Sequence, residues 1–331
     1  MVQQTKYPDY PFLDTSRLDT VASYLSARNL LRESERVLRL ETIGAPSRNS
    51  LARVVTAERA FVLKQFTEWP ANGTSAPAAE DRFKAECQFH RSSRIAECPK
   101  SPVPALLHYD ARARCLLMED AGAGAGGHFS PTADDAQSLG WILVNLHHHT
   151  QSVPACARYE NWAVRQWLSS HLFVGDTGTS RPAPWLERLM RASASVRETL
   201  KDARRALAEG GTCLIHGDFL PRNWMKNAGR CQVVDAEFSF FGRPEFDAGS
   251  FLAGLMFRRA SAETLQAALA VLESGCVRYD PRFVAAFAGA HLVRLLDSAP
   301  KGTGAPSGPT ASALLRRVAR AMQTQSLAAL R

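Results

Sequence analysis

The 331-residue sequence predicts an α+β protein with a sheet-forming first part and a mainly helical second part. Residues 1–120 contain several short runs rich in Val, Leu and Phe, whereas helical patterns dominate after residue 130. Between the two parts, residues 121–130 read AGAGAGGHFS, a composition typical of a hinge or linker. We therefore expect two lobes, comprising residues 1–120 and 121–331.

The first lobe is expected to contain a sheet with one helix inserted. Its strand segments are short and are separated by Gly, Pro and Asn, which are typical of turns. Residues 16–40 are also expected to be helical, because DTVASYLSARNLL repeats apolar residues at spacings of three and four. The other predicted elements are strands at 34–44 and 50–66, a loop at 69–79, a helix at 80–96 and two short strands within 103–121.

The second lobe is expected to be mainly helical. Thr132 can cap the first predicted helix, TADDAQSLGWILVNLHHHT, which carries acidic residues in its first turn. The last predicted helix, at 312–330, is amphipathic and basic, and we interpret it as packed on the lobe rather than lying on a membrane. Further helices are predicted at 160–174, 183–208, 261–275 and 281–297, with a strand-rich segment at 213–241.

The composition is that of an ordinary globular protein. Hydrophobic residues make up 45% and charged residues 22%, and no run of 18 apolar residues predicts a membrane span. The N-terminus lacks the basic and apolar segments of a secretory signal. The seven cysteines are scattered and form no C-x-x-C pair, so we expect reduced thiols in a cytoplasmic protein. The sequence leaves open whether the protein forms a homodimer.

The formal net charge of +8 raises the question of a nucleic-acid partner. The basic residues are spread along the chain and no nucleic-acid-binding motif is present, so we expect neither a nucleic-acid nor a membrane partner. The same charge suits the attraction of an anionic cosubstrate such as ATP. We therefore expect a small molecule as the partner.

Polar side chains are concentrated in the segment CLIHGDFLPRNWMKNAGRCQVVDAEFSFFGRPEFDAG, residues 213–249. Its CLI and CQVVD runs are typical of buried strands, so Asp218 and Asn223 follow one strand and Asp235 ends the next. Phosphoryl transfer needs such groups. One carboxylate orients the acceptor hydroxyl and accepts its proton, while an amide oxygen and a second carboxylate hold Mg²⁺. The alternative interpretation is a polar hairpin tip.

The pattern H-G-D-x-x-x-x-N followed by V-D-x-E resembles the catalytic and metal-binding loops of the aminoglycoside phosphotransferase and choline kinase superfamily. These enzymes share the protein-kinase-like fold. The resemblance implies a small N-terminal lobe with an antiparallel sheet, and ATP and Mg²⁺ as cofactors. It also implies that Asp218 is the catalytic base, that Asn223 and Asp235 are magnesium ligands, and that Glu237 is a further ligand.

The first lobe contains matching parts. Lys64 lies in the apolar strand FVLKQF, where a charged group needs a partner. The resemblance implies that Lys64 holds the phosphates of ATP and pairs with Glu86 on the inserted helix. The remaining nucleotide-binding candidates are Met118, Glu119 and Asp120 in the hinge-like LLMEDAG, and Asn49 in the degenerate phosphate loop ETIGAPSRNSLARVV.

Within this superfamily, VVDAEFSFFGRPEFDAGSFLAGL is most similar to the 5-methylthioribose kinase family, over roughly residues 35–300. Members of that family phosphorylate the anomeric hydroxyl of methylthioribose. This chain departs from the family in being shorter, in carrying Asn223, and in having Arg294 alone where the family has an Arg-Arg pair. The other candidates are Arg294 and Trp224 for substrate contact, and His216 and Asp247 for support of the catalytic loop. Trp224 is one of four tryptophans that could line a pocket, although most of the four are expected to lie in the core.

These residues together predict a kinase that transfers the γ-phosphate of ATP to a hydroxyl of a small molecule, with a sugar such as methylthioribose as the leading acceptor. The basic second lobe argues against a polycationic acceptor. Phosphorylation of an aminoglycoside, an amino alcohol or another antibiotic is one alternative. A nucleotide-binding pseudokinase that acts as a regulator is another.

Overall fold

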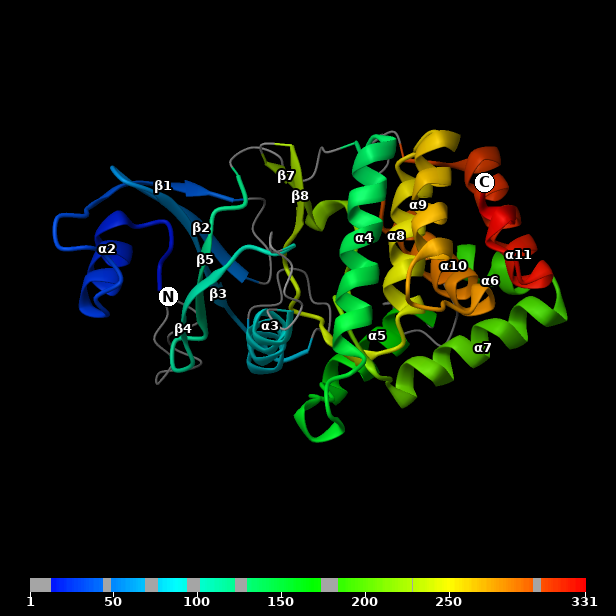
Figure 1. Ribbon diagram of the computed structural model, residues 1–331, viewed down its shortest axis with the longest axis horizontal. Helices are drawn as coiled ribbons and strands as arrows, with labels where there is room; N and C mark the ends of the chain where they lie inside the picture. Colours follow the sequence, from blue (N-terminus) through cyan, green and yellow to red (C-terminus); the bar gives the residue numbers. More distant parts are fainter. Residues whose placement is uncertain are drawn as a thin grey trace.

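The computed structural model describes residues 13–43, 49–68, 77–93, 102–122, 130–173, 184–227, 229–299 and 305–331. Its first part forms a sheet with helices and the rest forms a larger helical body, so the described residues make two lobes (Figure 1). Gly44 and Ser47 of the predicted phosphate loop, and most of the AGAGAGGHFS segment, lie outside the described residues.

A five-stranded antiparallel sheet forms the smaller lobe, with strand order β1-β2-β3-β5-β4 (Figure 1). The predicted run at 50–66 is divided into two strands by a turn at 57–59. β3 is central, and its Lys64 lies opposite Leu51 on one side and Leu116 on the other. The strands are β1 (Val37–Thr42), β2 (Asn49–Thr56), β3 (Ala60–Phe66), β4 (Leu106–Asp110) and β5 (Cys115–Glu119).

Two described helices flank this sheet, α2 (Leu18–Ala27) and α3 (Ala79–Ser93). The expectation that residues 16–40 are helical is wrong for the second half of that segment. Asn29 takes a left-handed φ of 53° and the Leu30 N–H donates to the Leu25 carbonyl, which ends the helix before β1. The inserted helix was predicted, and it is α3.

Glu35 holds the connection between α2 and β1. Its buried carboxylate accepts hydrogen bonds from Arg59 Nε (2.9 Å) and Nη2 (2.9 Å), from Thr56 Oγ1 (2.8 Å) and from the Arg32 N–H (3.0 Å). The bonds from Arg59 are the main cause that lowers the pKa of Glu35 to about 2. The carboxylate is therefore stabilised in its charged form.

Stability is expected to depend on this carboxylate in acid. Because the ordinary pKa of Glu35 is 4.5, its contribution is complete above that pH and is lost as the pH falls toward 2. Glu35→Gln should lower the free energy of unfolding at pH 7 by about 3 kcal/mol and flatten its pH dependence in this range. Urea unfolding at several pH values checks this, with the exposed Glu33→Gln as control. Equal acid sensitivity of the three proteins would contradict it.

The larger lobe is built around α8 (Glu245–Phe257), in which every residue from Glu245 to Met256 is buried. A helix buried on all sides occupies the centre of its domain, and α8 packs against α10 (Pro281–Ser298). In the part of the chain that the structure describes, no helix has the length and apolar character needed to cross a membrane. The surrounding helices are α4 (Ala133–Thr150), α5 (Trp162–Phe173), α6 (Pro184–Met190), α7 (Ala194–Glu209), α9 (Ala262–Ser274) and α11 (Gly308–Thr324).

Side-chain caps explain where two of these helices begin. Thr132 caps α4, as predicted, because its hydroxyl accepts from the Asp135 N–H. The helical pattern predicted at 183–208 forms two helices, α6 and α7, because Ser193 adopts an extended conformation and caps α7.

The strand-rich segment predicted at 213–241 forms two antiparallel pairs. β6 (Cys213–Ile215) pairs with β9 (Phe240–Gly242), and β7 (Trp224–Asn227) pairs with β8 (Arg230–Val233). β7 and β8 lie between the sheet and the helical body (Figure 1). The polar residues of this segment are therefore placed near the boundary between the lobes.

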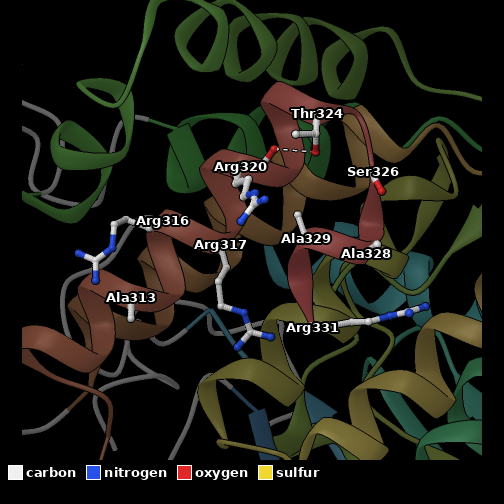
Figure 2. Close-up of a pocket in the computed structure, with 9 residues that line it drawn as sticks. All are labelled: Ala313, Arg316, Arg317, Arg320, Thr324, Ser326, Ala328, Ala329 and Arg331. Carbon is white, nitrogen blue, oxygen red and sulfur yellow. Dashed lines mark hydrogen bonds between the residues drawn. The ribbon is translucent and has the colours of Figure 1, made fainter.

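The basic C-terminal helix α11 packs on the lobe, as interpreted from the sequence. Leu315, Val318 and Met322 are buried, and the helix packs against α10. Its other face borders a cavity of about 680 Å³ (Figure 2). The cavity lies at the end of the molecule far from the sheet (Figure 1). It is lined by Ala313, Arg316, Arg317, Arg320, Thr324, Ser326, Ala328, Ala329 and Arg331.

Candidate active site

The polar segment 213–249 meets the small lobe at Lys64. β6 leads into the loop that carries Asp218, and β8 leads to Asp235. The pairing of β6 with β9 and of β7 with β8 holds the ends of these loops. Lys64 of β3 donates a hydrogen bond to Asp235, so the predicted nucleotide-binding and metal-binding residues are in contact.

Asp247 anchors the loop that carries Asp218. Its carboxylate accepts from the N–H groups of His216 (2.5 Å) and Gly217 (3.0 Å). His216 accepts from the Asp218 N–H at Nδ1 (3.3 Å), so its proton is on Nε2, which donates to the Val234 carbonyl (3.1 Å). Burial lowers the pKa of His216, which favours this neutral ring. Asp247 and His216 therefore both hydrogen-bond to the backbone of this loop, which agrees with their predicted supporting role.

Gly217 is expected to tolerate no side chain. Its φ is +79°, and a Cβ would lie 2.0 Å from the Phe238 carbonyl oxygen. Gly229 has nearly the same φ, +78°, but a Cβ there would meet nothing within 4 Å. Gly229→Ala should therefore cost only the backbone strain, about 1–2 kcal/mol. Gly217→Ala should destabilise the protein more and abolish turnover by displacing Asp218; thermal unfolding and turnover measure the two effects. Equal behaviour of the variants would argue against this loop geometry.

Asp218 is a buried carboxylate held by two residues of its own loop. Each of its oxygens lies 2.6 Å from Nη2 of Arg222, and Oδ2 accepts from Nδ2 of Asn223 at 2.9 Å. Burial would raise the pKa of Asp218, but Arg222 and Arg294 hold it below its ordinary value. Asp218 is therefore ionised at neutral pH, the form that accepts a proton. The Asn223 amide nitrogen faces Asp218, which leaves its oxygen for another partner.

Lys64 contacts carboxylates from both lobes. Its Nζ donates to Glu86 Oε2 at 2.5 Å and to Asp235 Oδ1, and Glu237 Oε2 lies 3.8 Å away. Lys64 is 1% exposed, and although burial opposes its charge, these carboxylates raise its pKa above the ordinary value. Lys64 is therefore a buried, charged lysine, and the predicted Lys64–Glu86 pair is present.

Asp235 combines an unusual backbone with a partly accessible side chain. Its φ is +67°, in the left-handed region that few residues other than glycine adopt. Its side chain is 37% exposed, whereas that of Lys64 is 2% exposed. Burial would raise the pKa of Asp235, but the charge of Lys64 lowers it, so the carboxylate is ionised. A ligand can reach this carboxylate from solvent.

Three carboxylates provide an all-oxygen set suited to a hard cation. Glu86, Asp235 and Glu237 each contribute one oxygen, and these oxygens lie within 4.8 Å of one another. Among the described residues, Lys64 and Arg82 form ion pairs with these carboxylates, and the charge of Arg222 also acts on Asp235 and Glu237. Burial raises the pKa of Glu86 to about 7. Grouped carboxylate oxygens are the donors that Mg²⁺ prefers.

Glu237 binds residues of the small lobe. Its Oε2 accepts from Asn49 Nδ2 (2.6 Å) and from Arg82 Nη1 (3.0 Å), and Arg82 also donates to Asn49 Oδ1 (2.7 Å). Asn49 and Glu237, predicted as a nucleotide contact and a metal ligand, therefore contact each other. Arg82, at 2% exposure, was missed from the sequence. Its signal was its position one helical turn before Glu86, which places both on one face of α3.

The predicted hinge residues lie where the chain leaves the sheet. Met118 pairs with Val62 in β3, and the Glu119 N–H donates to the Ala105 carbonyl at 2.9 Å. The Asp120 carboxylate accepts from Arg53 Nε of β2 at 2.7 Å. These bonds fix the backbone of residues 118–120 beside β3.

Trp224 lies in the hydrophobic core. It is fully buried, with its ring centroid 5.9 Å from that of Phe219 and 5.5 Å from that of Phe251. The expectation that Trp224 contacts a substrate is therefore wrong. The physical reason is that β7 turns this side chain inward against α8, beneath the catalytic loop.

Arg294 lies beside Trp167 in the larger lobe. The charge of Arg294 acts on Asp218, and its guanidinium carbon lies 5.9 Å from the centroid of the Trp167 ring. Trp167 stacks on Phe238 at 4.9 Å and on His171 at 4.5 Å. The charge of Arg294 therefore reaches Asp218, and its contact with a substrate stays a prediction.

The family is decided by a sequence comparison. A model of the phosphotransferase enzyme family matches residues 39–287, which is three quarters of the chain. The chain belongs to the phosphotransferase enzyme family. The matched span contains Lys64, Asp218 and Asp235, so this family assignment covers the site just described. The predicted resemblance to the aminoglycoside phosphotransferase and choline kinase superfamily is confirmed.

Curated relatives of this family member include methylthioribose kinases. The enzyme from Yersinia pseudotuberculosis serotype O:3 is 23% identical over 205 residues, covering 56% of this chain and 49% of that protein. The enzyme from Citrobacter koseri is 23% identical over 205 residues, covering 56% of this chain and 50% of that protein. The chain thus spans about half the length of the curated relatives that it matches.

Solved structures establish the fold of this family member. A choline/ethanolamine kinase family protein from Mesorhizobium loti superposes with a TM-score of 0.55 at 19% identity, over 95% of this chain and 98% of that one. An aminoglycoside-3'-phosphotransferase of type VIII superposes with a TM-score of 0.52 at 17% identity, over 83% and 97%. The predicted two-lobed, protein-kinase-like α+β fold is confirmed.

Proposed function

We propose that this protein is an ATP- and magnesium-dependent kinase that transfers the γ-phosphate of ATP to a hydroxyl of a small molecule, with a sugar such as 5-methylthioribose as the leading acceptor. The observation that carries this proposal is that Lys64 contacts both Glu86 of the small lobe and Asp235 of the polar segment 213–249. The same polar segment contains the ionised Asp218. We place the nucleotide between lobes comprising residues 1–120 and 121–331. The phosphotransferase family and the methylthioribose kinase relatives support the reaction class.

In the proposed reaction, Asp218 orients the acceptor hydroxyl and accepts its proton. The acceptor oxygen bonds to the γ-phosphorus, the bond from that phosphorus to the β,γ-bridging oxygen breaks, and ADP leaves. Asp218 suits this role because it is ionised and because Asp247 holds its loop. Lys64 binds the phosphates and Glu86 orients it. Positioning and charge neutralisation supply most of the rate.

Magnesium, when bound, neutralises the phosphate charge. Asp235 and Asn223 are the proposed ligands, since Asp235 is partly exposed and the Asn223 amide oxygen is turned away from Asp218. The grouped oxygens of Glu86, Asp235 and Glu237 support a cation site. Because Arg82 and Asn49 already bind Glu237, it is proposed as an additional ligand or a link between the lobes.

The charges around Asp218 favour an acceptor that is not cationic. Arg222 and Arg294 both act on Asp218, and an amino group or a quaternary ammonium brought to its side would be repelled by them. A sugar is therefore favoured over an aminoglycoside or an amino alcohol.

The test is ATP consumption with Mg²⁺ against methylthioribose, other pentoses, choline, homoserine and several aminoglycosides, with wild type beside Asp218→Ala. The expected result is turnover of a sugar that is lost in the variant. Turnover of a cationic acceptor instead would overturn the proposed substrate and retain the reaction class. ATP binding without turnover of any acceptor would favour a pseudokinase regulator.

A further inference from the structure

Arg222 covers the oxygens of Asp218. Its Nη2 donates to both Oδ1 and Oδ2 at 2.6 Å, although the reaction requires Asp218 to receive the acceptor hydroxyl. The Arg222 side chain is 47% exposed, whereas that of Asp218 is 3% exposed. Within the described segments of the chain, Nε and Nη1 of Arg222 make no hydrogen bond, so the guanidinium has further donors to offer.

The backbone that carries Arg222 is fixed by packing. Arg222 lies in the short 3-10 helix η2 (Pro221–Asn223), in which the other two residues are buried. Pro221 Cδ lies 2.6 Å from the point that a Cβ would occupy at Gly254 of α8, and Trp224 is buried in the core. Only the long Arg222 side chain is therefore open to movement, from an anchored Cα.

The charge of Arg222 acts on three carboxylates, those of Asp218, Asp235 and Glu237. Asp218 is the proposed base and Asp235 the proposed metal ligand, so the charge of Arg222 acts on both of these groups. A phosphoryl group in transfer must also be near both, because its acceptor is held by the base and its oxygens by the metal. Without nucleotide, the nearest anion to this guanidinium is the Asp218 carboxylate. A γ-phosphate would offer it more charge and more acceptor oxygens.

We propose that Arg222 binds the γ-phosphate of ATP, stabilises the charge on the phosphoryl group during transfer, and thereby frees Asp218 for the acceptor hydroxyl. Arg222 would then be a catalytic residue that acts from within the catalytic loop. It exchanges one anionic partner for another and keeps all of its protons. This inference rests on the proposed function, since it needs ATP in the site.

The test compares the affinities for ADP and for the non-hydrolysable analogue β,γ-methylene-ATP, both with Mg²⁺, by calorimetry. Wild type, Arg222→Ala, Arg222→Lys and Arg191→Ala are measured side by side. Arg191 is the matched control, because it pairs with Glu187 at the same four-residue spacing on the surface. Arg222→Ala should bind the analogue on the order of ten- to a hundredfold more weakly and bind ADP almost unchanged. Arg222→Lys should recover part of the loss, and Arg191→Ala should match wild type.

The outcomes separate the two proposals. If Arg222→Ala loses affinity for both nucleotides equally, or for neither, the inference about Arg222 is overturned while the proposed function stands. If wild type binds neither nucleotide, both are overturned. The melting temperature of each variant is measured as well, so that a folding defect is distinguished from the loss of a γ-phosphate contact.

Discussion

Asp218→Asn is expected to lower kcat on the order of 10²–10⁴-fold and to change the affinity for ATP only a few-fold. The substitution removes the charge that accepts the acceptor proton and retains most of the shape and hydrogen bonding of the side chain. Asp218 contacts Arg222 and Asn223 rather than Lys64, so the nucleotide-binding side of the site should stay intact. Steady-state kinetics and calorimetry with ATP measure the two effects separately.

The control for this substitution is Asp134→Asn in the first turn of α4, where the aspartate is exposed. It removes one carboxylate from the same lobe and should leave kcat unchanged. The melting temperature of Asp218→Asn should stay close to that of wild type, because Arg222 is half exposed and can be hydrated. If Asp218→Asn retained more than about a tenth of the activity, another group would have to be the base.

Lys64→Met is expected to affect both stability and function. The substitution leaves Glu86, Asp235 and Glu237 close together, and the ion pair that remains to them among the described residues is that of Arg82 with Glu237. Breaking a buried ion pair from one side costs about 3–5 kcal/mol. Chemical unfolding measures that loss, and calorimetry should show that ATP binding is abolished because the phosphates lose their lysine.

The pH dependence of this variant gives a further check. Burial already raises the pKa of Glu86 to about 7 beside Lys64, and removal of the lysine should raise it further. A carboxyl with a raised folded-state pKa destabilises the protein above that pKa and ceases to do so as it is protonated. The loss of stability should therefore be greater at pH 8 than at pH 5.

Lys84→Met is the matched control for Lys64→Met. Lys84 lies on the exposed face of α3 and pairs only with Glu80 in the described structure, at 60% and 55% side-chain exposure. Surface pairs of this kind contribute about 0–1 kcal/mol, so this variant should keep nearly all of its stability and nucleotide affinity. Similar losses in the two variants would contradict the buried charge cluster around Lys64.

The catalytic segment was predictable because its information is local. Asp218, Asn223 and Asp235 are separated by short distances along the chain, and the apolar runs beside them predicted the strands that hold their loops. Lys64 was predictable for another reason: a charged residue within an apolar strand must find a buried partner. The structure places Glu86 at that lysine, as predicted.

Residues whose positions depend on packing were harder to predict. Trp224 directly follows the predicted magnesium ligand Asn223, but it begins β7 and its ring packs in the core. Arg82 contacts Glu237, which lies 155 positions away along the chain. The end of α2 at Ala27 was missed because the apolar spacing continues into the following strand, while the left-handed Asn29 breaks the helix.

The sequence determined the two-lobed α+β architecture, the grouping of polar residues in segment 213–249 and the Lys64–Glu86 pair, because periodicity, short-range spacing and the cost of a buried charge act within segments. Only the tertiary structure decided that Glu237 binds Arg82 and Asn49. Side-chain pairing between the lobes depends on which charges the fold brings within a few ångströms in a desolvated space. Electrostatic attraction there is strong, and the partner is set by proximity in space rather than by order along the chain.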